Sequence, residues 1–123
     1  MRRKDSADFN VVRKIAAALP DVEEGTAYGS PAFKVRGKLL TCLAVHKSAE
    51  AGTLAVRIGF EERAQLIAAD PDTYYLTDHY LAYPIVLVRL SRIQVDALRD
   101  LLSMAWRFVA EKSPKRRKNS RLI

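Results

Sequence analysis

Apolar residues recur at helical spacing in two segments, one near each end of the chain. The first can be capped by Asp8 or Ser6 and runs to about Leu19. The last begins at Ser91, with Gln94 three residues later in capping-box spacing. The expected buried stripes are Phe9, Val12, Ile15, Ala16 and Leu19 in the first helix and Val95, Leu98, Leu101, Leu102, Ala105, Phe108 and Val109 in the last. Both segments therefore predict amphipathic helices with one face on a core.

Between these helices the pattern changes to the alternation of extended chain, punctuated by glycine and proline. Gly37-Lys38 separates two such runs and predicts a two-residue hairpin turn, because glycine tolerates the positive φ that tight turns need. Phe60–Ala69 returns to a helical pattern and is followed by the turn-forming Asp70-Pro71-Asp72. The expected strands are Pro31–Arg36, Leu39–His46, Thr53–Ile58, Thr73–Leu76 and Ile85–Leu90.

This order of elements predicts an α+β fold. An antiparallel sheet would be covered on one face by the N- and C-terminal helices, with the short helix inserted between strands. Residues 1–111 are expected to form a single domain, because 123 residues support one core but not two. Residues 112–123 lose the apolar periodicity and predict a basic, disordered tail. No run of about 18 apolar residues occurs, so we expect no transmembrane helix and no membrane partner.

Alternation along the strands also predicts which side chains face away from the core. If Phe33 and Val35 face the helices, then Leu40, Cys42 and Ala44 join the core across the predicted turn. The cations left on the outer face and in the turn are Lys34, Arg36, Lys38, Arg57 and Arg89. The predicted strands contain no Asp or Glu, so they predict one positive sheet face. The simpler alternative is that long basic side chains only cover the solvent face of the sheet.

The formal net charge of +7 is concentrated at the ends of the chain. The cations there are Arg2, Arg3 and Lys4 at the start and Lys112, Lys115, Arg116, Arg117, Lys118 and Arg121 in the tail. Subtracting these nine cations leaves residues 5–111 with a net charge of −2. Basic ends attract polyanions through long-range, salt-sensitive electrostatics, although they can also serve only solubility.

The chain has one cysteine, Cys42, and two histidines, His46 and His79. A lone cysteine cannot form an internal disulfide, and no apolar signal segment follows the basic start, so we expect a cytoplasmic protein. Cys42 and His46 lack further zinc ligands, and the acidic turn at 70–79 lacks the spacing of a calcium loop, so we expect a buried structural thiol, no metal site and no cofactor. No nucleophile, acid–base or phosphate-loop motif occurs, so the sequence predicts no enzyme activity and no catalytic residues.

Several tyrosines lie in or near the predicted strands, where exposed rings could stack on the bases of a single-stranded nucleic acid. Tyr28 and Tyr80 are the best candidates for such exposure. Tyrosine is also an ordinary residue at the edge of a core, so the alternative is that both rings pack.

Several segments resemble the MmcQ/YjbR family in sequence, order and spacing. They are ALPDVEEG at 18–25, YGSPAFKVRGK at 28–38, DPDTYY at 70–75, and HYL at 79–81 with Pro84 and VLVRL at 86–90. The likeness extends from about Phe9 to Ala110 and implies a frataxin-like or type III secretion-chaperone-like fold, sometimes described as double-wing. It also implies the family's usual description as DNA-binding. Family members often have glycine and tryptophan near 82–85, where this chain has Ala82-Tyr83-Pro84-Ile85.

Charge placement and resemblance together predict a protein that binds DNA or another polyanion through phosphate contacts, without reading bases. The outer sheet face, the Arg36-Gly37-Lys38 hairpin and the tail cations Lys115, Arg116, Arg117 and Lys118 would make these contacts. The alternative is an adaptor that binds a protein or a small ligand without catalysis, which an exposed apolar patch near Tyr80, Tyr83 and Ile85 would favour. The sequence does not indicate an oligomeric state.

Overall fold

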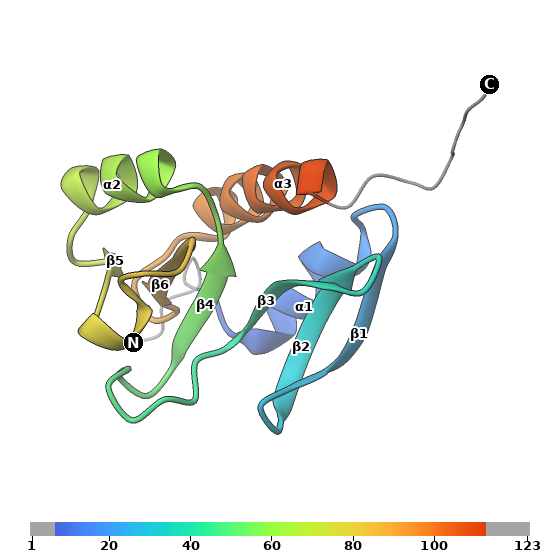
Figure 1. Ribbon diagram of the computed structural model, residues 1–123, viewed down its shortest axis with the longest axis horizontal. Coiled ribbons are helices and arrows are strands. Elements are labelled where there is room, and N and C mark those ends of the chain that lie inside the picture. The colour runs from blue at the N-terminus through green and yellow to red at the C-terminus, as the bar shows by residue number, and fades with distance from the viewer. Residues whose placement is uncertain (1–6, 113–123) are drawn as a thin grey trace.

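A computed structural model describes residues 7–112 of the chain as an α+β fold built on one antiparallel sheet (Figure 1). The sheet has six strands in the order β1-β2-β3-β4-β6-β5. The strands are β1 (Val22–Ala27), β2 (Ser30–Val35), β3 (Lys38–Leu43), β4 (Thr53–Arg57), β5 (Tyr74–Tyr75) and β6 (Ile85–Arg89). The helices are α1 (Phe9–Ala17), α2 (Phe60–Ala69), the 3-10 turn η1 (Asp78–Tyr80) and α3 (Val95–Lys112). The predicted fold class is therefore confirmed.

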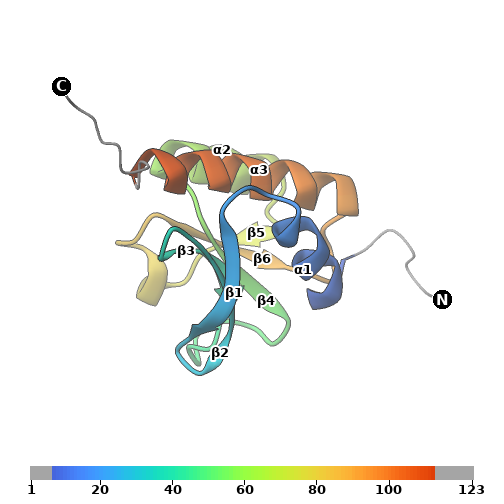
Figure 2. The same cartoon turned by 90° about the vertical axis from the view of Figure 1, so that its right-hand side faces the viewer.

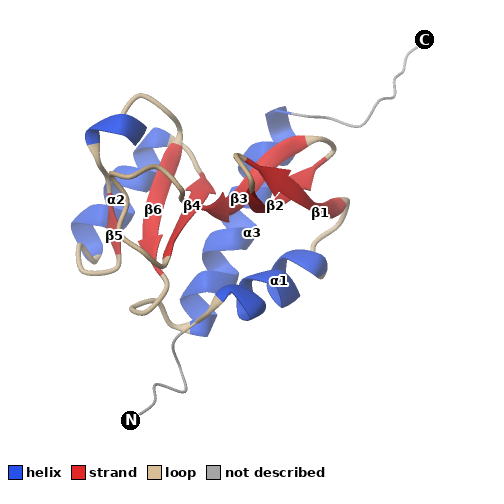
Figure 3. Cartoon of the chain, turned by 90° about the horizontal axis from the view of Figure 1, so that it is seen from below, coloured by secondary structure: helices blue, strands red, loops and turns tan. Residues whose placement is uncertain are grey.

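The terminal helices cover one face of the sheet, as the sequence predicts (Figures 1 and 2). The view in Figure 3, from below, shows the strands in front of α3. The largest fully buried side chains of the helix-covered core include Phe33, Leu40, Leu54, Leu98 and Leu102. The indole N–H of Trp106 donates to the carbonyl of Pro20 at 2.8 Å and ties α3 to the loop after α1. Within residues 7–112, no helix has the length and apolar character needed to cross a membrane.

Most predicted helix boundaries agree with the structure, but the predicted start of α3 does not. Asp8 caps α1, since its side chain accepts from the amide of Val11 at 3.0 Å. α2 has the predicted bounds, and α3 ends one residue beyond the predicted domain boundary. Ser91 does not cap α3 but lies in a turn, and the amide of Leu98 donates to the carbonyl of Gln94. The capping-box prediction was wrong because the turn after β6 takes up the residues before Gln94.

The β2–β3 hairpin turns at Arg36-Gly37, one residue earlier than predicted. Both residues have positive φ, 50° and 84°, and Val35 lies opposite Lys38. A two-residue turn of this kind needs positive φ at both positions, which places glycine second rather than first. Lys38 is therefore the first residue of β3 and not part of the turn.

A β-bulge in this hairpin reverses the predicted faces of β3. Phe33 lies opposite Thr41 and Lys34 lies opposite Leu39, so Leu40 is an extra residue with no partner in β2. One extra residue shifts the alternation by one position. Beyond the bulge, Cys42 and Ala44 pack in the apolar cluster of the outer face, not in the helix-covered core. The inward prediction was therefore right for Leu40 and wrong for Cys42 and Ala44.

The first strand of the sheet carries acidic residues, contrary to the prediction of acid-free strands. β1 contains Glu23 and Glu24, which point to opposite faces because they are adjacent in an extended segment. The sequence pattern did not reveal this strand, because VEEGTA lacks the apolar alternation of a half-buried strand. β1 forms one edge of the sheet beside β2.

Candidate functional site

The strand cations do not form the positive face predicted for them. Nη2 of Arg36 lies 2.8 Å from Oδ2 of Asp21, and Nη2 of Arg89 lies 2.8 Å from Oε2 of Glu50. Arg89 also donates to two backbone carbonyls and lies 4.1 Å from the centroid of the Tyr75 ring. The hydrogen bonds from Arg89 hold the pKa of the Glu50 carboxyl below its ordinary value. Two of the five predicted phosphate contacts are thus already paired with carboxylates.

The other strand cations have different surroundings. The guanidinium of Arg57, near the end of β4, lies 5.8 Å from the ring centroid of Phe108 on α3. Lys38 lies opposite Val35, a residue of the helix-covered core, and is exposed. By register, three of the predicted cations do lie on the outer face: Lys34 lies opposite Leu39, Arg57 lies opposite Ile85, and Arg89 lies two residues after Leu87. The predicted outward register of these three residues is right, but Arg89 is paired with Glu50 and Arg57 reaches Phe108, so they do not form one continuous cationic face. Lys115, Arg116, Arg117 and Lys118 lie outside the described residues.

The outer face is instead apolar at its centre. Its buried residues are Ala32, Cys42, Ala55, Tyr80 and Leu87, contributed by four strands and η1. Tyr80 is 8% exposed, so its predicted exposure was wrong. The segment that carries η1 folds back over the sheet, and this places the Tyr80 ring on the apolar strand residues.

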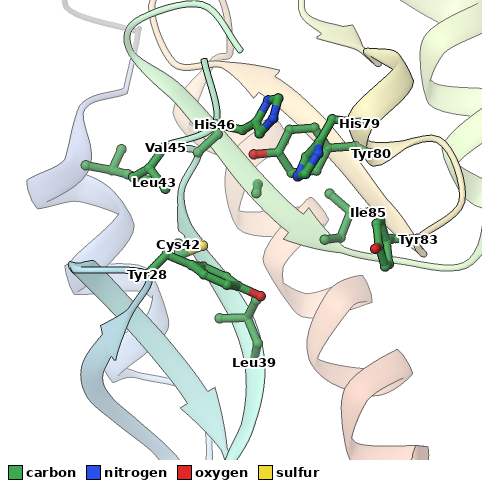
Figure 4. A pocket seen from close by; sticks show the side chains of 12 residues that line it. Tyr28, Leu39, Cys42, Leu43, Val45, His46, His79, Tyr80, Tyr83 and Ile85 are labelled. Atoms are coloured by element: carbon green, nitrogen blue, oxygen red, sulfur yellow. The ribbon is translucent and has the colours of Figure 1, made fainter. Parts of the chain in front are cut away.

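A pocket of about 440 Å³ opens on this face (Figure 4). Its lining residues are Tyr28, Leu39, Cys42, Leu43, Ala44, Val45, His46, Ala55, His79, Tyr80, Tyr83 and Ile85. None of these described residues is acidic. A mostly apolar hollow of this size, with few polar groups, is typical of binding sites for small organic groups.

Two histidine rings stack against each other in the pocket wall. The ring centroids of His46 and His79 are 3.5 Å apart and the planes differ by 8°, while Tyr80 meets the His79 ring edge-on. The amide of Ser48 donates to Nδ1 of His46 at 3.1 Å, which leaves the proton of the neutral ring on Nε2. Desolvation first, and then the charges of His79 and Lys47, lower the pKa of His46. The two stacked rings therefore form a flat aromatic wall, in which the His46 ring is predominantly neutral near pH 7.

Tyr28 is the most exposed large apolar side chain among the described residues and lies at the mouth of the pocket. It is 82% exposed, which confirms its predicted exposure. Tyr28 and Gly29 form the β1–β2 turn with φ of 55° and 78°. Left-handed backbone is costly for a residue with a bulky side chain, and asparagine, aspartate or glycine is usual there. An exposed tyrosine at a strained position favours a role in binding over a role in folding.

A buried arginine fixes the opposite wall of the pocket. Arg63 of α2 is 8% exposed. Its Nη1 donates to the carbonyls of Tyr83 at 2.7 Å and Ile85 at 3.3 Å, and its Nη2 donates to that of Leu81 at 3.2 Å. Burial lowers the pKa of this guanidinium. Arg63 thus positions the segment that presents the 55% exposed ring of Tyr83.

Sequence reasoning found part of this site, because it named Tyr28 and the patch around Tyr80, Tyr83 and Ile85. It assigned Cys42 to the helix-covered core, however, and considered His46 and His79 only as weak metal ligands. Within residues 7–112, no group of three or more potential metal-ligating side chains converges. The signal that could have been followed is Gly29, since a glycine between two extended segments marks a turn whose tip is exposed.

The sequence pattern of the YjbR family matches residues 17–108, which covers β1 to β6 and most of α3. The chain belongs to the YjbR family. This confirms the family resemblance, and all the residues that line the pocket lie within the matched range.

Curated relatives of this YjbR chain carry no named activity. Uncharacterized proteins of Mycobacterium tuberculosis (Rv2570) and Mycobacterium bovis (Mb2600) are each 47% identical over 47 residues. These matches span 38% of this chain and 36% of each relative. A crystal structure of the Deinococcus radiodurans protein DR2400, with a DUF419 domain, superposes with a TM-score of 0.73 at 18% identity. It covers 90% of this chain and 84% of that one, and it supports the fold alone.

Cys42 of this YjbR protein is expected to react slowly with thiol reagents. The thiol forms part of the pocket floor, is 3% exposed, and burial raises its pKa. Since the thiolate is the reactive form, alkylation by iodoacetamide should be at least about tenfold slower in the folded protein than in urea. Mass spectrometry of timed samples measures both rates. Equal rates would show that the floor of the pocket is open to solvent.

Proposed function

We propose that this protein is a non-catalytic binding protein that accepts a flat aromatic group in the pocket of the outer sheet face. The observation that carries the proposal is the exposed ring of Tyr28 at a strained turn, beside an apolar hollow with stacked His46 and His79. A bound ring would bury the apolar floor and stack offset or edge-on against these side chains.

The proposed ligand chemistry follows from what the pocket can offer. Its wall provides imidazole and phenol rings, which favour a planar partner over a branched aliphatic one. Its floor contains Cys42 and Ala55, which have no charge to match a buried ion. The thiol is kept protonated by burial, and Nδ1 of His46 is occupied by Ser48, so the proposal involves binding without a chemical step.

This proposal revises the DNA-binding hypothesis drawn from the sequence. Duplex DNA lying along a cationic sheet face loses its support, because Arg36 and Arg89 are paired with carboxylates and Arg57 lies against α3. The adaptor alternative gains support, since the pocket is flanked by Tyr80, Tyr83 and Ile85, as that alternative requires. A nucleobase remains one of the planar groups that fit the site.

Titration with adenosine and indole, followed by NMR of the histidine ring protons, tests the proposal. We expect shifts of His46 and His79 that saturate with either probe. Ala44→Phe, which fills the pocket, should abolish these shifts, while Ala68→Phe on the exposed side of α2 should leave them unchanged. Histidine signals that do not respond to either probe would refute the proposal.

A further inference from the structure

We infer that the flat group is an unpaired base of a single-stranded nucleic acid; this rests on the proposed function and names its ligand class. The pocket supplies the aromatic part of such a ligand. The positive charge around the pocket and at the ends of the chain would attract the phosphates of such a ligand.

Lysines lie beside the pocket at opposite ends. Lys34 lies opposite Leu39 in the β2–β3 pair, and Leu39 lines the pocket. Lys47 is exposed and follows His46, which lines the far end in Figure 4. A base inserted between these ends would place the phosphate on each side within the field of one lysine.

The two lysines are not equivalent. Glu23 of β1 lies opposite Lys34 in the neighbouring pair, and its carboxylate reduces the positive potential there. Residues 7–112 show no ion pair for Lys47. Lys47 is therefore expected to contribute more to phosphate binding than Lys34 does.

The remaining attraction comes from the ends of the chain. Nine cations stand at residues 2–4 and 112–121, whereas residues 5–111 carry a net charge of −2. The aromatic pocket would bind the planar part of a ligand, and the cationic ends of the chain would attract its phosphates. A neutral metabolite would use only the pocket, and a duplex would use only the charge.

A single strand is favoured because the pocket accepts the face of a ring. In a duplex both faces of each base are covered by its neighbours, so a paired base cannot enter without unstacking. Proteins that hold single strands combine aromatic platforms with positive charge, and stacking tolerates every base because each has a π-face. We therefore expect weak dependence on sequence and strong dependence on strandedness.

The test compares a labelled 12-nucleotide oligothymidylate with the corresponding oligothymidylate–oligoadenylate duplex, using the full chain at several salt concentrations. We expect the single strand to bind about tenfold more tightly than the duplex. Ala44→Phe should lower single-strand affinity about tenfold and leave duplex affinity unchanged. Lys47→Gln should reduce the slope of log affinity against log salt by roughly 0.7. The matched controls Ala68→Phe and Lys14→Gln, both at exposed positions on helices, should behave as the parent protein.

The outcomes separate this inference from the proposed function. Equal affinity for both oligonucleotides, unchanged by Ala44→Phe, would overturn the inference and assign binding to the basic ends alone. If adenosine or indole still moved the His46 and His79 signals, the proposed function would stand. If neither adenosine nor indole moved these signals, both the inference and the proposed function would fail. Pocket binding of N-acetyltryptophanamide without oligonucleotide binding would also overturn the inference, in favour of an aromatic side chain of a protein partner.

Discussion

Tyr28→Asn is expected to weaken binding of aromatic ligands about tenfold while making the folded protein more stable. Loss of one stacking ring typically reduces affinity by this factor or more. Tyr28 has a φ of 55°, which asparagine adopts at a lower cost than tyrosine does. The gain in the free energy of unfolding should be about 0.5–1 kcal/mol. Urea denaturation and adenosine titration of the same samples measure the two changes.

The opposite signs of the two effects make this prediction specific. Tyr28→Phe keeps the ring and should retain most of the affinity. Arg36→Asn at the β2–β3 turn, where φ is 50°, relieves comparable strain away from the pocket but removes the ion pair with Asp21. It should leave adenosine affinity unchanged. A Tyr28→Asn protein that binds normally, or that is less stable, would contradict the role assigned to this ring.

Arg63→Leu is expected to lower the free energy of unfolding by about 3 kcal/mol. The guanidinium donates to the carbonyls of Leu81, Tyr83 and Ile85, and leucine would remove all three bonds, leaving the amide of Ile85 as a donor to the carbonyl of Tyr83. Losing several hydrogen bonds from one charged and largely buried donor costs on this order. Urea denaturation measures the change, and the pocket segment should also show faster amide exchange.

Two comparisons make the Arg63 measurement interpretable. Arg63→Lys keeps the charge but not the forked geometry, so its destabilisation should be intermediate. Arg92→Leu, at an exposed position after β6, should change stability by less than about 0.5 kcal/mol. A loss below about 1 kcal/mol for Arg63→Leu would mean that water replaces the lost donors and that Arg63 does not fix the pocket wall.

Much of the fold could be predicted because periodicity is a local property. The stripe containing Leu98, Leu101 and Leu102 identified α3, and the run at 85–90 identified β6. The helix-covered face of β4 and β6 was also placed correctly, since Leu54, Val56, Val86 and Val88 all lie in that core. These elements obey alternation without interruption.

The outer face could not be predicted, because a bulge and a folded-back loop decide it. Leu40 looks like any core residue in the sequence, yet as an unpaired residue it reverses the faces of Cys42 and Ala44. η1 then covers the sheet and buries Tyr80. Neither the bulge nor the folded-back segment produces a periodic pattern in the sequence. The residues that line this face can therefore be identified only once the strand register is known.

The ion pairs likewise depend on tertiary contacts. Arg89 and Glu50 are 39 residues apart in sequence, and Arg36 and Asp21 are 15 apart. Counting charges by strand therefore identified the cations but not the carboxylates that neutralise them. Glu23 also lies opposite Lys34 because β1, a strand that the sequence pattern did not predict, pairs with β2.

Photo-crosslinking with a 5-iodouracil-substituted oligothymidylate, followed by mass spectrometric mapping, tests the pocket as the nucleic-acid site most directly. The predicted result is attachment to Tyr28, His79 or Tyr83, which line the pocket, with loss of these crosslinks in Ala44→Phe. Crosslinks confined to residues 113–123, and insensitive to Ala44→Phe, would contradict it.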